Sequence, residues 1–381
     1  MQKSYPYVLV PGMAGWGESS LLNRYVPYWG LIHCDMAKVL TARGYEAHAA
    51  SVAPLGSAWD RACELYAQLV GTRVDYGKAH SEKFGHDRYG VTYDKPLFEG
   101  WSADKKVNLI CHSFGGVTAR MLSYLLAEGD EAERETTQDG TLSPLFAGGN
   151  RGMIFSITTL TSPHNGTDLQ VAIPKPLSVL VQDAYYAINW VVPNSPFKKL
   201  YDVQLGHFGI GCGDSPLNVK EMRHFCESED NVFTDVGVDG SMRINKHICA
   251  QDDVYYFSFP VSCTKMNQKG NQKPAKFMLM MHIFSYGLGS YTATTKDGYI
   301  VDDSWKMNDG VVNTISAEAP ATEPSVKYDP AHVEKGVWNV MPTIFGDHGT
   351  VVGWTASKRV AMPTICKQVE RIDALSRKES E

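Results

Sequence analysis

One run of residues, Val107 to Gly116, limits the possible folds more than any other part of the chain. It begins as an apolar stretch from Val107 to Ile110, which predicts a buried strand. It then turns through Ser113 onto two glycines, and a helical pattern of apolar residues continues to Gly129. A strand, a sharp turn that carries a serine and a helix are typical of a nucleophile elbow, which holds the hydroxyl above a sheet. Ser113 is therefore a candidate nucleophile, and the alternative is an ordinary serine in a loop.

The elbow departs from the usual G-x-S-x-G pattern, because Cys111 stands where the first glycine is expected. A second loop, Pro11 to Gly17, is rich in glycine and follows the apolar strand predicted at Tyr7–Val10. It lacks the G-x-G-x-x-G pattern of a dinucleotide loop, which favours a role as a donor of backbone N–H groups to an oxyanion. Met13 and Phe114 are the expected donors, and a plain turn is the alternative for this loop.

Strand and helix patterns alternate along the chain. Apolar runs predict strands at 7–10, 45–52, 107–110, 153–160 and 254–259, and helical spacing predicts helices at 31–43, 57–70, 117–128, 174–193 and from 363 onward. This alternation predicts an α/β fold with a mostly parallel central sheet and helices on both faces. We expect one domain over residues 1–381, with insertions at about 72–100 and 171–250. Charged residues 128–139 are expected in solvent, and residues 201–250 are expected to be irregular.

The segment 72–100 is polar and aromatic, and it is long for a loop in a compact domain. It contains His80 and His86, which together with Asp60 offer two imidazoles and a carboxylate that suit zinc. The two histidines lie six residues apart and cannot share one helix face. Ser57 and Asp60 also fit a capping box, so a role for Asp60 in capping its helix is the alternative.

An amphipathic helix is predicted between Pro174 and Pro193, with a proline at each end. One interpretation is a helix that packs on the core. The other is a lid whose apolar face covers a site in water and opens onto lipid. The Met-rich segment 277–291 could likewise line an acyl pocket or fill the core.

Two further residues complete a possible catalytic triad. Asp309 precedes a turn glycine, and His348 lies in a short loop before Val351. The chain order Ser113, Asp309, His348 is the order expected in an α/β-hydrolase. Ser113 would attack an acyl carbon, His348 would transfer the proton, and Asp309 would orient the imidazole. Other residues that could fill the last two roles are Asp302, Asp303 and His332, and His164 lies in an earlier loop near the site.

Composition excludes some classes of function. The net charge of −6 argues against a nucleic-acid partner. No run of 18 apolar residues is present, so no transmembrane helix is expected. The first predicted strand follows almost at once after Met1, so we expect no signal peptide within this chain, and either the protein stays in the cell or a leader has been removed. The eight cysteines include no C-x-x-C and do not by themselves indicate disulfides.

Several longer motifs carry a family resemblance, which extends over roughly residues 5 to 375. These motifs are Trp59 to Gly71, Val74-Asp75-Tyr76-Gly77, Gly85-His86, Ser143-Pro144-Leu145-Phe146, Thr161 to Gly166, Asn308 to Thr314 and Lys335 to Asn339. With them the chain resembles the thermoalkalophilic bacterial lipases of subfamily I.5, the group that includes lipases of Geobacillus and Staphylococcus.

The resemblance implies an α/β-hydrolase fold with a helical lid, and a triacylglycerol lipase that works through an acyl-enzyme. Its catalytic residues match Ser113, Asp309 and His348. It also implies a structural zinc that ties the insertion to the core without performing chemistry. The ligands of that zinc match Asp60, His80, His86 and an aspartate after the lid, most simply Asp239, with Asp235 as the alternative.

Two departures from the family pattern matter. The oxyanion loop has Pro11-Gly12-Met13 in place of His-Gly-Phe, which keeps the N–H donor and changes the pocket wall. Relatives bind calcium through acidic residues at positions that correspond to Thr350 and Thr355, which argues against a calcium site here.

Other functions remain open at this point. An esterase or polyesterase of short-chain or synthetic esters, a non-catalytic protein that binds lipid, and an enzyme with a catalytic metal are the alternatives. Family members are usually secreted, and a cytoplasmic protein is the alternative for location. The sequence does not indicate an oligomeric state.

Overall fold

The computed structural model describes residues 5–193, 195–201, 203–211, 219–278 and 281–380. Its centre is a seven-stranded sheet in the order β13-β14-β7-β6-β5-β1-β2, in which every pair of neighbours is parallel. The strands are β1 (Tyr7–Val10), β2 (Ala47–Ala49), β5 (Val107–His112), β6 (Ile154–Leu160), β7 (Tyr255–Phe259), β13 (Ser325–Lys327) and β14 (Trp338–Val340). The expected parallel sheet is confirmed.

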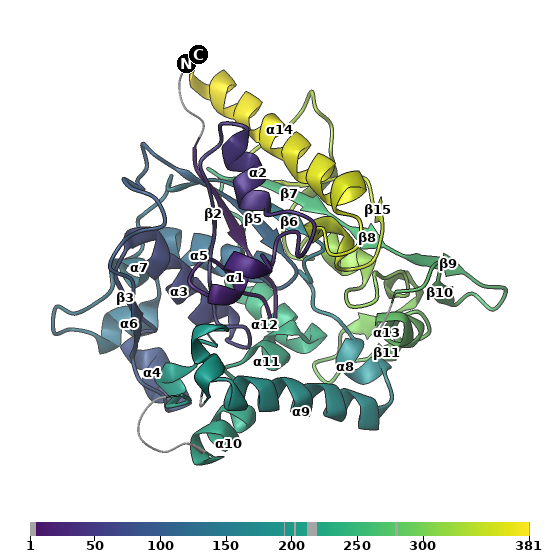
Figure 1. The fold of residues 1–381 in the computed structure, drawn as a ribbon, viewed down its shortest axis with the longest axis horizontal. Coiled ribbons are helices and arrows are strands. Elements are labelled where there is room, and N and C mark those ends of the chain that lie inside the picture. The colour runs from purple at the N-terminus through teal and green to yellow at the C-terminus, as the bar shows by residue number, and fades with distance from the viewer. Residues whose placement is uncertain (1–4, 194, 202, 212–218, 279–280, 381) are drawn as a thin grey trace.

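Helices cover both faces of this sheet, as Figure 1 shows. Alternate residues of a strand point to opposite faces, so Val8 and Val10 of β1 join one core while Tyr7 and Leu9 join the other. The first core contains α3 (Ala58–Val70) and α5 (Gly115–Glu128), and the second contains α2 (Met36–Ala42) and α14 (Met362–Ser380). The near-continuous apolar strands therefore lie between two helical layers.

Caps determine where several helices begin and end. The Ser57 hydroxyl accepts a hydrogen bond from the Asp60 N–H at 3.1 Å, which starts α3, and Gly71 ends it with φ of +73°. The helix predicted over 31–43 begins only at Met36, because the Asp35 carboxylate accepts from the Lys38 N–H and fixes the start there. The first five residues of that prediction are therefore not helical.

The insertion at 72–100 is ordered as β3 (Arg73–Asp75), α4 (Lys78–Phe84) and β4 (Tyr89–Thr92), with β3 and β4 antiparallel. Glu133 of α6 (Glu131–Thr136) accepts hydrogen bonds from the N–H groups of Ala79 and His80, at 3.0 and 2.7 Å. Glu133 is only 1% exposed, so the expectation that the charged stretch lies wholly in solvent is wrong for this residue. Its carboxylate caps α4 from another part of the chain.

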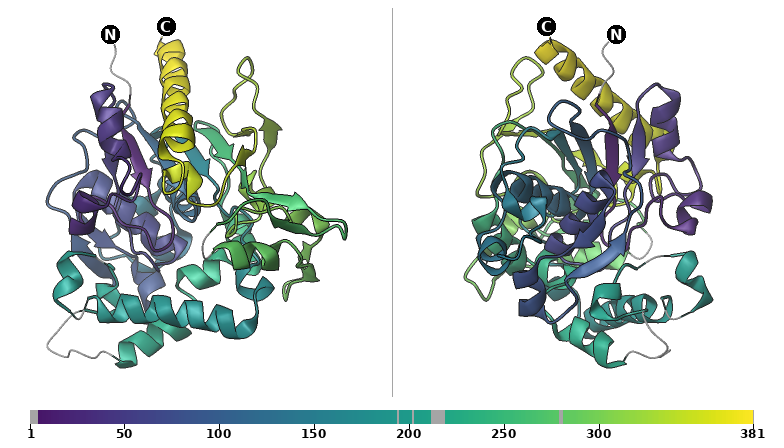
Figure 2. Two further views of the ribbon diagram at one scale, coloured as in Figure 1. Left: turned by 45° about the vertical axis from the view of Figure 1, so that its right-hand side comes forward. Right: turned by 90° about the vertical axis from the view of Figure 1, so that its left-hand side faces the viewer.

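The second insertion is largely helical. It contains α8 (Leu169–Ala172), α9 (Lys175–Val191), η1 (Pro196–Lys199), η2 (Gly206–Phe208), α10 (Val219–Glu227), α11 (Val232–Val236) and α12 (Val238–His247). The amphipathic helix predicted before Pro193 is α9, and it lies at the end of the molecule opposite α14 (Figures 1 and 2). The expectation of an irregular segment at 201–250 is wrong, because short helices occupy much of it.

Smaller elements complete the described structure. They are α1 (Leu21–Tyr25), α7 (Pro144–Ala147), β8 (Val261–Ser262), β9 (Thr264–Met266), β10 (Gln272–Pro274), α13 (Met281–Leu288), β11 (Ala293–Thr294), β12 (Ile300–Val301), η3 (Asp303–Trp305), η4 (Thr314–Ala317), β15 (Ile344–Phe345), η5 (Thr350–Val352) and η6 (Ser357–Ala361). Within the part of the chain that the structure describes, no helix is both long enough and apolar enough to cross a membrane.

Candidate active site and metal centre

Ser113 occupies a strained turn between β5 and α5. Its φ of +54° is in the left-handed region, which is unusual for a residue with a side chain. Its N–H donates to the Leu160 carbonyl at 3.0 Å, which holds the turn against β6. A Cβ atom at Gly12 would lie 2.6 Å from the Ser113 Cβ, so only glycine lets the loop after β1 approach this closely. The serine is 8% exposed at the carboxyl edge of the sheet.

Asp309 and His348 form a buried pair at the same edge. The Asp309 Oδ2 atom lies 2.7 Å from the His348 Nδ1 atom. The carboxylate also accepts from the Thr161 hydroxyl at 2.6 Å and from the N–H groups of Val311 and Val312 at 2.9 and 2.8 Å. Four donors thus hold this fully buried carboxylate in one orientation. With Nδ1 donating to Asp309, the His348 Nε2 atom carries the lone pair that a general base needs.

A hydrogen bond from His112, the residue before Ser113, connects this pair to the elbow. His112 Nε2 lies 3.0 Å from the His348 carbonyl oxygen. No hydrogen bond between Ser113 Oγ and His348 Nε2 is formed among the described residues, and such contacts are often long before substrate binds. The Asp309–His348 pair is thus anchored beside Ser113.

The other candidates for the acid and the base lie elsewhere. Asp302 binds Ser304 at the surface, and His332 pairs with Asp329 at 2.9 Å where both side chains are exposed. His164 is fully buried, and its Nε2 atom lies 3.0 Å from the Thr159 hydroxyl. None of these groups is bonded to Asp309 or His348 in the described structure.

Of the two predicted oxyanion donors, Met13 lies on the loop after β1, and Phe114 directly follows Ser113 in the elbow. The N–H groups of Met13 and Phe114 find no acceptor among the described residues, which leaves them available to a ligand. Phe114 is also the first residue of the turn into α5, where the helix dipole adds positive charge. The geometry therefore fits an oxyanion site at this position.

Arg61 is a residue of this region whose role the sequence pattern does not reveal. Its guanidinium is fully buried beneath the loop after β1. It donates to the carbonyls of Pro11 and Ala53, at 2.6 and 2.7 Å, and to the Thr118 hydroxyl at 2.9 Å. Arg61, a residue of α3, therefore holds the loop after β1 in place from beneath.

A second cluster of polar side chains joins the insertion to the core. Asp60 of α3, His80 of α4, His86 and Asp230 present ligand atoms that all lie within 4.8 Å of one another. His80 Nε2 lies 3.1 Å from Asp230 Oδ2 and 3.4 Å from Asp60 Oδ1, and His86 Nε2 lies 3.2 Å from Asp230 Oδ2. This buried group could hold a metal ion.

The chemistry of the donors fits a cation. His86 Nδ1 donates to the Asp87 carbonyl at 2.9 Å, so its Nε2 atom has a free lone pair. Asp60 Oδ1 is buried without a hydrogen-bond partner, while Asp60 Oδ2 faces His207 Nε2 at 2.8 Å. Burial alone would lower the pKa of His80, yet Asp230 and Asp60 raise it to about 10, which shows how strongly the two carboxylates favour positive charge.

The fourth member of the cluster is Asp230, and the prediction of Asp239 or Asp235 is wrong. Asp239 lies on α12, where its Oδ1 atom faces the Asp297 N–H at 3.4 Å. Asp235 Oδ2 accepts from the Ala58 N–H at 2.7 Å and so serves the first turn of α3. Asp60, by contrast, belongs to the cluster although its N–H is capped by Ser57. No second group of this kind occurs among the described residues.

Thr350 and Thr355 surround a carboxylate next to the catalytic candidate. Both hydroxyls donate to Asp347 Oδ1, at 2.8 and 3.1 Å, and the Lys276 ammonium lies 3.4 Å from Asp347 Oδ2. The Asp347 carboxylate, which directly precedes His348, thus has two hydroxyl groups and one ammonium group as its partners. These contacts bind the loop of His348 to the segment that carries Lys276.

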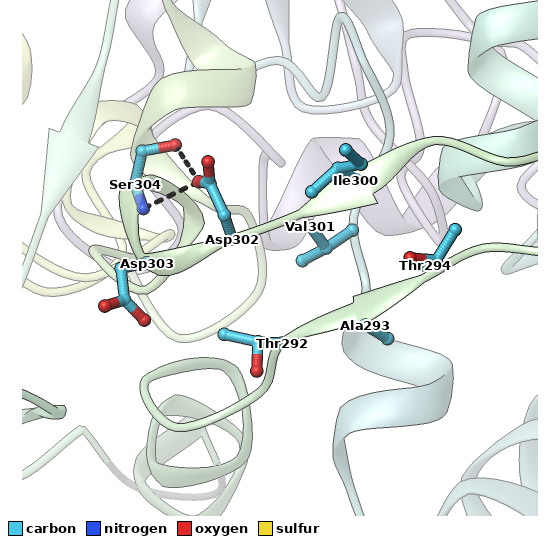
Figure 3. Close-up of a pocket in the computed structure, with 8 residues that line it drawn as sticks. All are labelled: Thr292, Ala293, Thr294, Ile300, Val301, Asp302, Asp303 and Ser304. Atoms are coloured by element: carbon cyan, nitrogen blue, oxygen red, sulfur yellow. Dashed lines mark hydrogen bonds between the residues drawn. The ribbon is translucent and has the colours of Figure 1, made fainter.

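Figure 3 shows a surface hollow beside the hairpin of β11 and β12. Both polar and apolar residues line it. The Asp302 carboxylate accepts hydrogen bonds from the N–H and the hydroxyl of Ser304. None of the residues that line it belongs to the Asp309–His348 pair, the elbow or the metal cluster. It is therefore a feature separate from both sites.

A parallel sheet with a strained serine after its interior strand β5, and an Asp–His pair at the same edge, define an α/β-hydrolase fold. Residues 3–366 match the family described as lipase-like, C-terminal domain, and the chain belongs to that family. Lipase 2 of Staphylococcus aureus is 33% identical over 92% of this chain and 50% of its own length.

Two solved structures are similar over nearly their whole length. The lipase of Staphylococcus hyicus has a TM-score of 0.87 at 30% identity, covering 99% of this chain and 97% of that chain. Lipase 1 of Pelosinus fermentans has a TM-score of 0.79 at 34% identity, covering 100% of this chain and 99% of that chain. The chain spans about half the length of the curated relatives it matches.

Proposed function

We propose that this protein is a serine carboxylester hydrolase of the lipase type, with Ser113, His348 and Asp309 as its catalytic triad. The observation that carries the proposal is the Asp309–His348 pair, anchored beside a strained serine at one sheet edge, in which three further donors also hold the Asp309 carboxylate. The family to which the chain belongs, and the relatives that are named lipases, support the choice of substrate class.

The proposed reaction has two steps. Ser113 Oγ attacks the acyl carbon as His348 Nε2 takes its proton, and the N–H groups of Met13 and Phe114 stabilise the oxyanion. The tetrahedral intermediate then releases the alcohol, which receives the proton from His348. Water repeats the sequence on the acyl-enzyme and releases the carboxylic acid. Asp309 keeps the imidazole in the required tautomer throughout.

We further propose that α9 is a lid that opens onto lipid. Four apolar residues on its outward side, Val179, Leu180, Ile188 and Val191, are 45 to 63% exposed. Its inner side packs through Tyr185 and Tyr186 against Phe225 and Phe233. An apolar helix face in water favours contact with an acyl chain or an oil surface. A location outside the cell, as the resemblance implies, fits such a substrate.

We propose zinc as the ion of the Asp60–His80–His86–Asp230 cluster, in a structural role. Four protein ligands of nitrogen and oxygen suit a closed tetrahedral zinc site. The ion would tie the insertion to α3 and to the chain before α11. A structural ion predicts that chelation lowers thermal stability. The alternative, a catalytic metal, predicts that chelation abolishes turnover without lowering stability.

Hydrolysis of p-nitrophenyl esters from acetate to palmitate tests the proposed activity. We expect turnover of long-chain esters, loss of at least about 10³-fold in kcat for Ser113→Ala, and one fluorophosphonate adduct on Ser113. Turnover confined to short chains would favour an esterase or polyesterase and would remove the lid as an interfacial switch. No adduct and no turnover would favour a non-catalytic protein that binds lipid.

A further inference from the structure

Besides His348, the region around Ser113 contains another buried histidine, which the proposed reaction does not use. His112 directly precedes Ser113 and is 1% exposed, as is Tyr28 on the loop after α1. Their side chains face each other, with Tyr28 Oη 2.6 Å from His112 Nδ1. Each of these two side chains has a further partner on a different loop of the active site.

The hydrogen bonds of this pair run in one direction. The Gly12 N–H can only donate, and it donates to Tyr28 Oη at 3.1 Å. The His348 carbonyl can only accept, and it lies 3.0 Å from His112 Nε2. His112 Nε2 must therefore carry the proton, its Nδ1 atom must accept, and the Tyr28 hydroxyl must donate to it. The series reads Gly12 N–H to Tyr28, Tyr28 O–H to His112, and His112 N–H to His348.

Burial maintains this arrangement. Burial and the nearby His348 lower the pKa of His112 well below its usual range, so the ring stays neutral. Burial raises the pKa of Tyr28, so its hydroxyl keeps its proton. Aromatic rings enclose the pair, because the rings of Trp29 and Trp354 lie 6.3 and 5.9 Å from His112. The Trp354 indole N–H also donates to the Tyr28 carbonyl at 2.9 Å.

We infer that Tyr28 and His112 are positioning residues, which set the oxyanion loop and the loop of His348 relative to each other. Gly12 precedes Met13, the proposed oxyanion donor, and His348 is the proposed base. The two loops are far apart in sequence, and the chain of hydrogen bonds joins them directly behind Ser113. The inference rests on the proposed function, since it assigns these residues to the same reaction.

Removal of one hydroxyl tests the inference. We expect Tyr28→Phe to lower kcat by about 10-fold with little change in KM, because misaligned donors weaken the transition state more than substrate binding. Tyr7→Phe is the matched control, since Tyr7 is fully buried and its hydroxyl donates to the Val369 carbonyl at 3.1 Å in the core of the molecule. Both variants should lose similar thermal stability, and only Tyr28→Phe should lose kcat.

A double-mutant cycle separates positioning from general damage. Glutamine at position 112 places an amide N–H near the position of Nε2 but offers nothing at Nδ1, so His112→Gln already breaks the bond to Tyr28. In that background Tyr28→Phe should cost little further kcat, which gives a coupling of about 10-fold. Independent, multiplicative losses would overturn the inference, as would an unchanged kcat in Tyr28→Phe.

Failure of the inference differs from failure of the proposed function. If Ser113→Ala abolishes turnover while Tyr28→Phe equals Tyr7→Phe, the hydrolase stands and the positioning role falls. If Ser113→Ala keeps its turnover, the proposed function itself falls. Should Tyr28→Phe not fold, the rate of fluorophosphonate labelling of His112→Gln decides the question, because a purely structural role predicts labelling at the wild-type rate.

Discussion

At the scale of single residues, Asp168 is a buried carboxyl that the proposed reaction does not use. It is 2% exposed, and burial raises its pKa from 3.8 to about 7, although Asn313 acts in the opposite direction. The folded state thus holds a proton at this site more tightly than the unfolded chain does. Its contribution to stability therefore falls as the pH rises from about 4 to about 7, and it stays constant above that interval.

Asp168→Asn should remove this dependence. We expect the variant to melt at a higher temperature than the wild type at pH 8, with a gain in free energy of unfolding of at most about 4 kcal/mol. The two proteins should melt alike at about pH 3, below both pKa values, where the carboxyl is largely neutral in both states. Asp94→Asn, at an exposed position, is the control and should change nothing. An equal gain at every pH would contradict the explanation.

The candidate site shows which residues a sequence can predict. Ser113, Asp309 and His348 are predictable because each lies in a local pattern and their order along the chain is diagnostic. Asp230 is not, since Asp230, Asp235 and Asp239 are chemically equal and only the path of the chain decides which one meets His80. The catalytic roles of the triad and of the oxyanion donors stay predictions that the proposed assays test.

At the scale of elements, the insertion at 72–100 depends on a helix cap that comes from outside the insertion. Helix α4 has Gly77 at its start, which offers no side chain, and the Glu133 carboxylate of α6 accepts from two of its first N–H groups instead. Glycine is favoured at position 77 because its φ of +93° suits few other residues, and a Cβ atom there would also lie 2.3 Å from that carboxylate. His80 is one of the capped residues, and the cap therefore also orients a member of the cluster that could hold a metal ion.

Glu133→Ala should weaken the insertion and its hold on metal together. We expect a loss of about 1–2 kcal/mol of stability from the missing cap, and faster loss of bound metal to a chelator. Thermal melting and metal content after dialysis measure the two effects. Glu131→Ala, on the exposed side of the same helix, is the control. Retention of metal equal to that of the control would show that the cap does not orient His80.

Some of the helices and strands can be predicted from their sequences, and others cannot. Strands β1, β5, β6 and β7 are predictable because buried parallel strands are short apolar runs. Helices α3 and α5 are predictable because apolar residues recur at helical spacing and a glycine, Gly71 or Gly129, ends each helix. The sequence pattern does not predict α10 and α12, since both are short and largely polar and are held by tertiary contacts. The single-domain organisation stays a prediction.

At the scale of the whole molecule, the metal cluster links parts of the chain that are 150 residues apart, as for His80 and Asp230. An ion there would bind only the folded state and so add its binding free energy to stability. Removal by a chelator should lower Tm by about 5–10 °C while turnover at 25 °C persists. Asp230→Asn should behave like the chelated protein, and Asp239→Asn like the wild type. Loss of turnover without a change in Tm would instead indicate a catalytic metal.

The order of strands in the sheet has a consequence for local unfolding. Ser113, the oxyanion loop and Thr161 follow β5, β1 and β6, which are adjacent and lie inside the sheet, whereas α9 lies at the periphery. Backbone amides in such interior strands exchange with solvent only on large openings, while peripheral helices open at much lower cost. Amide protons of α9 should therefore exchange with deuterium long before those of β5. A molecule that has transiently lost the order of α9 would still keep the elbow, the oxyanion loop and the Thr161 contact assembled.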